Sequence, residues 1–217
     1  MVYASSPIGC ILAGGKGERM GGVCKPLLTI GSKSLLELQI AALKPQTRSL
    51  LVSTARVANL LAHSNIAVVT DAQCGEQYIQ QGPLAGVVSA LDWLNREHTD
   101  SDWLLTIPGD TLCIPRNFSE LLMNSIRRHQ SVDAKCAFAV CDNNPYYLAA
   151  LWHRDCLADL RHYLDSGERK VSQFLCGQNA VKVEFSRTNT ASLPPFFNIN
   201  TQDDYDYAKA AMANKNL

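Results

Sequence analysis

The chain has 217 residues, of which 47% are hydrophobic and 18% are charged. This composition is typical of a folded globular protein, without the polar excess of a disordered one, and the length suits one large domain over residues 1–217. Twenty basic residues balance twenty acidic ones, so no net field attracts a polyanion. We therefore expect no nucleic-acid partner and no membrane partner, while a small phosphorylated ligand still fits because it needs only local charge and backbone N–H groups.

The N-terminal residues and the spacing of the cysteines indicate in which cellular compartment we expect the protein. The opening residues have no basic region before their apolar stretch, so they do not form a signal peptide, and no run approaches the roughly 20 apolar residues that span a bilayer. The eight cysteines are scattered through a chain that is large enough to be stable without disulfides. No Cys-x-x-Cys or His-x-x-x-His pair occurs. We expect a cytoplasmic protein with reduced thiols and no zinc site.

Short runs rich in Ile, Val and Leu alternate with segments of helical periodicity along the chain, which predicts an α/β fold with a parallel sheet and helices on both faces. The expected strands are Ile8–Ala13, Ser49–Thr54, Ile66–Thr70, Trp103–Pro108, Ala134–Val140, Tyr147–Trp152 and Ala180–Glu184. The expected helices are Ser34–Leu43, Leu84–Glu97, Asn117–His129, Cys156–Leu164 and Thr201–Ala213. In open α/β sheets ligands bind beyond the carboxyl ends of the strands, so the loops after the strands are the places to search for a site.

The first strand runs directly into a glycine-rich loop. Residues 13–22 contain five glycines together with Lys16 and Arg19, and Lys25 follows. Glycine backbone turns tightly and brings N–H groups against phosphate oxygens, while the cations neutralise charge. The spacing matches neither a Walker loop nor the dinucleotide-binding Gly-x-Gly-x-x-Gly, which meets Met20 at its last position. A plain surface turn is the alternative, but the loop predicts a phosphate site of another kind.

Two aspartates also follow predicted strands. Asp110 comes directly after Trp103–Pro108, where one carboxylate suits Mg²⁺ that takes its other ligands from a nucleotide. Its alternative role is that of a turn residue or helix N-cap. Asp71 follows Ile66–Thr70 and has the same alternative. We predict Asp110 as the metal ligand.

Three further segments carry candidate residues. Gly82-Pro83-Leu84-Ala85-Gly86 opens a helix and permits close approach of a ligand, although a purely structural helix start explains it nearly as well. Asn198 and Asn200 present amides towards an acceptor or else cap the helix at Thr201, for which Asp203 and Asp204 would lie in the first turn. Gly167-Glu168-Arg169-Lys170 supplies a basic pair or a solvated helix start.

These segments together resemble one family. Residues 12–22, 82–86, Pro108-Gly109-Asp110-Thr111, 167–171 and 197–201 look like the motifs of molybdenum cofactor guanylyltransferases, over nearly the whole chain. The resemblance implies a three-layer Rossmann-like nucleotidyltransferase fold. It also implies GTP and molybdopterin, or molybdenum cofactor, as substrates, Mg²⁺ as cofactor, and transient contact with molybdoenzymes or cofactor-insertion proteins as recipients of the product.

The resemblance also implies roles for individual residues. The first loop would grip the triphosphate, Arg19 and Lys25 would act with Asp110 in catalysis, and Arg169, Asn198 and Asn200 would face the acceptor. The implied nucleotide contacts are Leu12, Ala13, Gly14, Gly15, Lys25, Ser53, Asp71, Gly82, Pro83 and Leu84.

Two positions depart from the family pattern. Cys24 stands where the family usually has an acidic residue before the loop lysine, and a thiol carries no charge there unless it is strongly acidified. Ser53 stands where the family often has Asn, and a hydroxyl offers fewer donors and acceptors than an amide. These departures keep open a non-catalytic nucleotide-binding protein beside the enzyme.

The reaction that the resemblance implies is attack by the acceptor's terminal phosphate on the α-phosphate of GTP, with release of pyrophosphate. A phosphomonoester is largely dianionic at pH 7 and needs no general base, so charge cancellation is the main requirement. The rival enzymes are a cytidylyltransferase for the same pterin and a sugar-phosphate nucleotidyltransferase. Gly14-Gly15 and Asn198-Ile199-Asn200 favour the guanylyl member.

Overall fold

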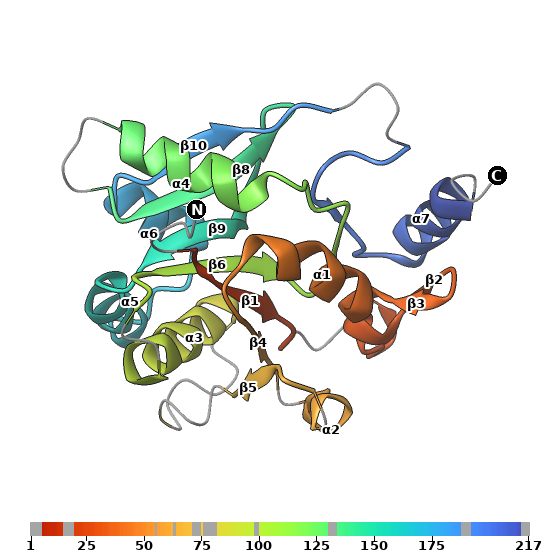
Figure 1. Ribbon diagram of the computed structural model, residues 1–217, viewed down its shortest axis with the longest axis horizontal. Coiled ribbons are helices and arrows are strands. Elements are labelled where there is room, and N and C mark those ends of the chain that lie inside the picture. The colour runs from red at the N-terminus through yellow and green to blue at the C-terminus, as the bar shows by residue number, and fades with distance from the viewer. Residues whose placement is uncertain are drawn as a thin grey trace.

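The computed structural model describes residues 6–14, 20–54, 56–62, 64–70, 75, 82–97, 100–129, 134–187 and 192–213. Within these ranges a seven-stranded sheet has the order β10-β8-β9-β6-β1-β4-β5 and crosses the molecule from the top of Figure 1 to the bottom. Its strands are β1 (Ile8–Leu12), β4 (Leu50–Ser53), β5 (Ala67–Val69), β6 (Trp103–Pro108), β8 (Cys136–Cys141), β9 (Asn144–His153) and β10 (Val181–Glu184).

The sheet is mostly parallel, as the sequence predicts, with β9 as the exception among the described strands. Strand β1 pairs in parallel with β4 and β6, and β4 and β8 pair in parallel with β5 and β10. Strand β9 runs antiparallel to both β6 and β8. It begins three residues before the predicted Tyr147, since a two-residue turn with positive φ at Asp142 and Asn143 joins it directly to β8.

Helices cover both faces of the sheet, which confirms the three-layer prediction (Figure 1). Helices α3 (Pro83–Glu97), α5 (Cys156–Asp165) and α6 (Val171–Gly177) pack on one face, and α1 (Leu35–Leu43), α2 (Ala58–Leu61) and α4 (Phe118–Arg128) pack on the other. The alternation of strand side chains decides the face: Cys10 and Leu104 enter the first core, and Ile11 and Leu105 enter the second.

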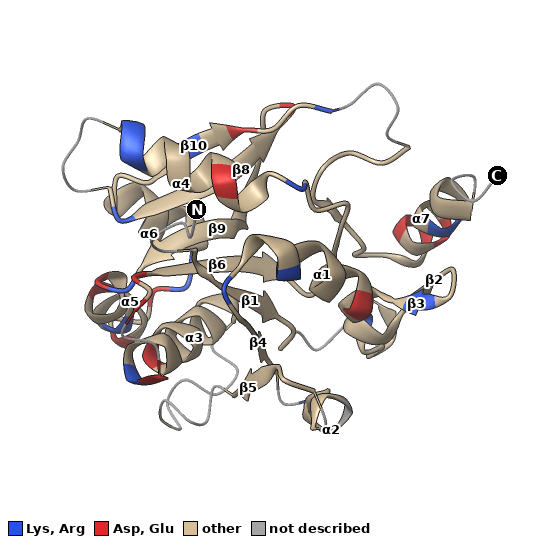
Figure 2. Ribbon diagram, viewed as in Figure 1, with Lys and Arg blue, Asp and Glu red and all other residues tan. Residues whose placement is uncertain are grey.

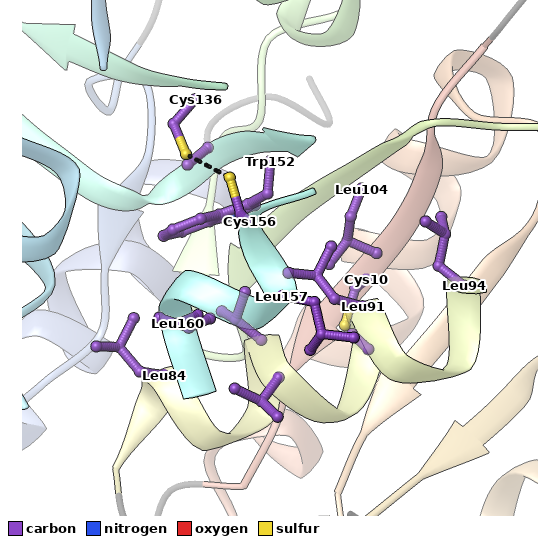
Figure 3. Close-up of a cluster of buried hydrophobic side chains, with 14 of the residues drawn as sticks. Cys10, Leu84, Leu91, Leu94, Leu104, Cys136, Trp152, Cys156, Leu157 and Leu160 are labelled. Atoms are coloured by element: carbon purple, nitrogen blue, oxygen red, sulfur yellow. Dashed lines mark hydrogen bonds between the residues drawn. The ribbon is translucent and has the colours of Figure 1, made fainter. Parts of the chain in front are cut away.

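The core under α3 and α5 is closed by large apolar side chains (Figure 3). Trp152 is fully buried, and its indole N–H donates to the Thr106 hydroxyl at 2.8 Å. The sulfur atoms of Cys136 and Cys156 lie 3.5 Å apart, within hydrogen-bond distance. The cysteines of the described ranges form no disulfide bonds. Burial raises the pKa of the Cys10 thiol to about 12, so this buried thiol stays protonated and inert.

A smaller third cluster lies beside the sheet. Helix α7 (Gln202–Ala213) packs there with the hairpin β2 (Thr29–Ile30) and β3 (Lys33–Ser34) and with the antiparallel pair β7 (Thr111–Leu112) and β11 (Phe197–Asn198). The short 3-10 helices η2 (Lys25–Leu27) and η3 (Lys44–Gln46) flank α1. Most of these short strands and 3-10 helices have no counterpart among the predicted elements, because two or three residues carry no periodic pattern.

The charged side chains are interspersed over the helices rather than gathered by sign (Figure 2). This distribution agrees with the balanced charge of the sequence. No helix in the described part of the chain is long and apolar enough to cross a membrane.

Candidate active site

The candidate site lies where β1 and β6 end side by side. Leu12 pairs with Pro108 on one side and with Ser53 of β4 on the other, so the carboxyl ends of three parallel strands meet at one edge. The chain leaves β1 towards β4 and later returns to its other side at β6, which makes this edge a topological switch point. A crevice opens at such a point because the connections leave it in opposite directions.

The turn after β6 is held tightly against the end of β1. The Gly109 N–H donates to the Leu12 carbonyl at 2.9 Å. A Cβ on Gly109 would lie 3.0 Å from both the Leu12 oxygen and the Ala13 Cα, which is closer than ordinary packing allows. The missing side chain is therefore what lets the Asp110 turn and the glycine-rich loop share one edge.

The described part of the glycine-rich loop has the backbone that the sequence predicts. The Ala13 N–H donates to the Ser53 carbonyl at 2.8 Å, which fixes the start of the loop. Gly21 and Gly22 have φ of +66° and +80°, a conformation that favours glycine. Gly14 has open space where a side chain would stand. The predicted contacts Gly15 and Arg19 lie outside the described residues, as does Asp71.

Three predicted residues meet in one contact. The Lys25 ammonium donates to the Asp110 carboxylate at 2.9 Å and to the Asn200 side-chain oxygen at 3.1 Å, across 85 and 175 residues of sequence. The Lys25 and Asp110 side chains are only 16% and 23% exposed. A residue predicted for phosphate, one for metal and one for the acceptor therefore share a single polar centre.

The start of α7 fixes the orientation of Asn200. The Asp204 carboxylate accepts the backbone N–H groups of Asn200 at 2.9 Å and Thr201 at 2.8 Å, and the Thr201 hydroxyl accepts the Asp204 N–H at 3.1 Å. This reciprocal cap confirms Thr201 as the helix N-cap. Burial raises the pKa of the Asp204 carboxyl, but these hydrogen bonds and the nearby Lys25 charge outweigh it and hold the pKa below its usual value.

Asn198, two residues before Asn200 at the end of β11, has different partners. Its side-chain oxygen accepts the Thr111 hydroxyl at 2.9 Å across the β7–β11 pair. The residue also lines a cavity of about 340 Å³. The other residues of this cavity come mostly from the first half of β9: Asn144, Pro145, Tyr146, Tyr147, Leu148 and Ala149, with Pro108, Thr111 and Val171.

The sequence analysis misses the two tyrosines of this cavity. Tyr146 and Tyr147 belong to an antiparallel strand that begins at the same edge where the parallel strands end. A search confined to residues after strands therefore passes over them. The signal available was the pair of adjacent aromatic residues at the start of the predicted strand Tyr147–Trp152.

The predicted residues at the helix start differ in exposure, since Gly82 and Pro83 are exposed and Leu84 is buried. Helix α3 begins at Pro83, directly after Gly82 with φ +83°, as predicted. Leu84 is fully buried, so only its backbone is available to a ligand. Ser53 is 3% exposed, and its hydroxyl lies 2.9 Å from where a Cβ on Gly86 would stand. The absence of that Cβ lets α3 close over Ser53.

Arg169 stands apart from the Lys25 centre. It is exposed and donates to the carbonyls of Leu164 and Glu168 at the end of α5. Helix α6 begins two residues later with Val171, which lines the cavity. Its predicted contact with the acceptor stays a prediction.

The donor set at this edge fits a magnesium ion better than a metal cage. No group of three or more His, Cys, Asp or Glu side chains comes together in the ranges that the structure describes. The Asp110 carboxylate is available at the crevice, with Oδ2 paired to Lys25. Mg²⁺ commonly binds through one or two carboxylates and completes its shell with phosphate oxygens and water, so the site is suited to a metal that arrives with a nucleotide.

The chain is similar to known proteins over nearly its whole length. The family model described as a MobA-like NTP transferase domain matches residues 9–181. A molybdenum cofactor guanylyltransferase of Mesorhizobium japonicum is 34% identical over 197 residues, which cover 90% of this chain and 91% of that protein.

Two solved structures share the fold. A molybdopterin-guanine dinucleotide biosynthesis protein A of Archaeoglobus fulgidus has a TM-score of 0.71 at 20% identity, covering 95% of this chain and 99% of that one. A Mycobacterium tuberculosis protein crystallised in complex with manganese has a TM-score of 0.62 at 12% identity, covering 95% and 100%. At these identities the structures support the three-layer fold alone.

Proposed function

Because the chain belongs to the MobA-like NTP transferase family and to its molybdenum cofactor guanylyltransferases, we propose that it transfers GMP from GTP to the terminal phosphate of molybdopterin or molybdenum cofactor. The products are the guanine dinucleotide cofactor and pyrophosphate. The observation that carries the proposal is the contact of Lys25 with Asp110 and Asn200 beside the glycine-rich loop.

The reaction places its main demand on charge. An oxygen of the acceptor phosphate forms a bond to the α-phosphorus of GTP while the bond from that phosphorus to the oxygen bridging to the β-phosphate breaks. The attacking phosphate is already largely dianionic at neutral pH, so no residue has to remove a proton. The site must instead hold the two phosphates in line and neutralise their charge.

Lys25 is placed to neutralise the triphosphate. Its ammonium has three donors, and Asp110 and Asn200 accept from it. A triphosphate in the crevice would compete for these donors, and Asn200 would be released towards the acceptor. The N–H groups of the loop around Gly14 and the Arg19 side chain would hold the remaining phosphate oxygens.

Asp110 is the residue that would hold Mg²⁺. When bound, the ion would supply Lewis-acid stabilisation of the phosphate charge that develops during transfer. The Lys25 ammonium, 2.9 Å from Asp110 Oδ2, would hold the carboxylate in place at the crevice. The manganese complex of the M. tuberculosis structural relative supports a divalent ion in this fold.

The 340 Å³ cavity beside Asn198 is the place that we propose for the acceptor. Tyr146 and Tyr147 both line this cavity, and an aromatic ring in its wall would suit a planar pterin ring. Asn198 offers its amide N–H group, because the oxygen is already used by Thr111. Arg169, just before Val171 in the cavity wall, would attract the acceptor phosphate.

The cellular setting follows from the substrates. GTP is a cytoplasmic nucleotide, and we place the reaction there. The product is a cofactor that other enzymes use, so we also propose transient contact with molybdoenzymes or with proteins that insert the cofactor.

The proposal is tested by pyrophosphate release from the purified protein with molybdopterin, Mg²⁺ and each of GTP, CTP, ATP and UTP. Of the four nucleotides, we expect only GTP to give pyrophosphate release, together with formation of the guanine dinucleotide. Preference for CTP would show a cytidylyltransferase instead. Thermal stabilisation by GTP without pyrophosphate release would show a nucleotide-binding protein that has lost turnover, because binding to the native state alone raises the melting temperature.

A further inference from the structure

The turn that carries Asp110 has a second support besides the strands. The turn spans Pro108, Gly109, Asp110 and Thr111. Its two central residues are tied to neighbouring segments, since the Gly109 N–H donates to the Leu12 carbonyl and the Asp110 carbonyl accepts the Ile199 N–H, both at 2.9 Å. The carbonyls of its first and last residues are available for one more contact.

Gln39 of α1 makes that contact. Its side-chain Nε2 donates to the Pro108 carbonyl at 3.0 Å and to the Thr111 carbonyl at 2.8 Å. A single amide group therefore bridges the two ends of the turn from 69 and 72 residues away in the sequence. Because Asp110 lies between these two carbonyls in the chain, fixing them restricts the backbone conformation that directs its carboxylate.

The orientation of this amide is fixed by chemistry. Gln39 is 1% exposed, and the reversed amide would place its oxygen against two carbonyl oxygens. Helix α1 is itself anchored by a capping box at Ser34 and Glu37 and by fully buried Leu35 and Leu43. The donor is therefore presented from a rigid element, as positioning groups in active sites require.

The other half of the amide shows that packing alone does not explain this glutamine. Its Oε1 is buried and has no hydrogen-bond partner among the described residues. A buried acceptor without a partner costs free energy, which an apolar side chain of the same length would avoid. What that apolar side chain would lose is the bridge across the Asp110 turn.

We propose that Gln39 is a positioning residue for Asp110: its amide holds the Pro108–Thr111 turn so that the carboxylate faces Lys25 and the metal that accompanies the nucleotide. The proposal rests on the proposed function in its use of Asp110 as the metal ligand. Gln39 touches no substrate and acts only through the turn. Removing its donor should therefore weaken the response to metal more than the response to nucleotide, as losses of supporting groups around metal ligands do.

The chain offers a matched control in Gln46. Its amide also donates to two carbonyls, those of Ala42 and Pro115, both at 2.9 Å, and its oxygen accepts the Ser119 N–H at 3.1 Å. This bridge ties η3 to the segment before α4 and does not contact the Asp110 turn. Gln46→Met therefore removes at least as many hydrogen bonds as Gln39→Met, without touching the proposed site.

The first experiment measures guanylyl transfer against Mg²⁺ concentration for the parent and both variants, at saturating GTP and acceptor. For Gln39→Met we expect the half-saturating Mg²⁺ concentration to rise roughly tenfold, with the KM for GTP at saturating Mg²⁺ changed little. For Gln46→Met we expect a lower melting temperature and an unchanged Mg²⁺ dependence. An unchanged Mg²⁺ dependence in folded Gln39→Met, or an equal rise in both variants, overturns the proposal.

A second variant and a second readout keep the test decisive. If Gln39→Met does not fold, Gln39→Asn replaces it, because a shorter amide stays polar but cannot reach both carbonyls. The amide resonances of Gly109 and Asp110 should shift in the Gln39 variant and stay in place in Gln46→Met. If Asp110→Asn leaves Mn²⁺ binding unaltered, the metal assignment fails. The resonances of Gly109 and Asp110 still decide whether Gln39 holds the Pro108–Thr111 turn. If these resonances do not shift in the Gln39 variant, the positioning role of Gln39 is wrong.

Discussion

The two sides of the crevice are built in opposite ways. On the nucleotide side, parallel strands β4, β1 and β6 all end at the edge, and the loops that follow supply glycine backbone and the Lys25–Asp110 pair. On the acceptor side, antiparallel β9 begins at that edge, and its first residues form a cavity wall with Tyr146 and Tyr147. The nucleotide side would bind its ligand through charged side chains and backbone N–H groups, and the acceptor side through the shape of its side chains.

This difference teaches where single substitutions should matter most. A charge that faces phosphate acts directly on the charge that develops in the transition state, so its loss affects the reaction strongly. An aromatic wall is shared by several residues, so the loss of one ring is partly compensated. The predictions below compare the two sides on this basis.

The largest effect is expected for Asp110→Asn on the nucleotide side. The amide keeps the shape of the side chain but removes the charge directed at the metal, so kcat/KM should fall by about 10³-fold. The melting temperature should change little, since the oxygen of the new amide can still accept the hydrogen bond from Lys25. Pyrophosphate release at several Mg²⁺ concentrations measures the effect, and an unchanged rate would defeat the metal assignment.

Lys25→Ala should weaken triphosphate binding roughly 10- to 100-fold. Its proposed partner is phosphate, so binding of guanosine should stay close to that of the parent. Calorimetry with GTP and with guanosine makes the comparison. Equal loss for both ligands would point to structural damage around Asn200, the other partner of Lys25.

On the acceptor side, Tyr147→Leu should raise the KM for the pterin acceptor roughly 2- to 10-fold and leave the KM for GTP unchanged. Leucine keeps apolar contact with Phe138, whose ring centroid lies 5.2 Å from that of Tyr147. Tyr205→Leu on α7 is the control, because Tyr205 does not line the cavity. If the KM for GTP rises as much as that for the acceptor, the two sides are not separate.

The smallest effect is expected for Cys24→Asp, which restores the charge that the family pattern has before the loop lysine. A carboxylate there would orient Lys25, and kcat/KM should rise roughly two- to fivefold. The melting temperature should not rise, because two effects of the substitution oppose each other. Cys24 is the N-cap of η2 and makes no side-chain hydrogen bond there, so Asp would be a better cap. Cys24 also packs against the second core, where a carboxylate is costly to bury.

Steady-state kinetics with GTP and the acceptor, together with a melting curve, measure both effects of Cys24→Asp. The added charge also opposes the positive field at the triphosphate. A lower kcat/KM than that of the parent would mean that Cys24 is adapted to this site and that the chain is not a weakened enzyme.

Much of the fold was predictable from local patterns. The seven strands of the sheet and five of the helices lie where runs of apolar residues and helical periodicity predict them, with ends shifted by a few residues. Helix α2 has no counterpart among the predicted elements, and α6 was anticipated only as a helix start at the basic residues ahead of it. The direction of β9 was also missed, because an apolar run looks the same in both directions and only the tight turn at Asp142 and Asn143 reverses the chain.

The sequence by itself determined the strands, the cap at Thr201 and the glycine-rich loop, since each depends on residues a few positions apart. Only the tertiary structure decided that Lys25, Asp110 and Asn200 meet and that Gln39 bridges the Asp110 turn. These contacts join segments 69 to 175 residues apart. They exist because the order of the strands returns β6 to the open side of β1, and no local preference of the chain encodes that order.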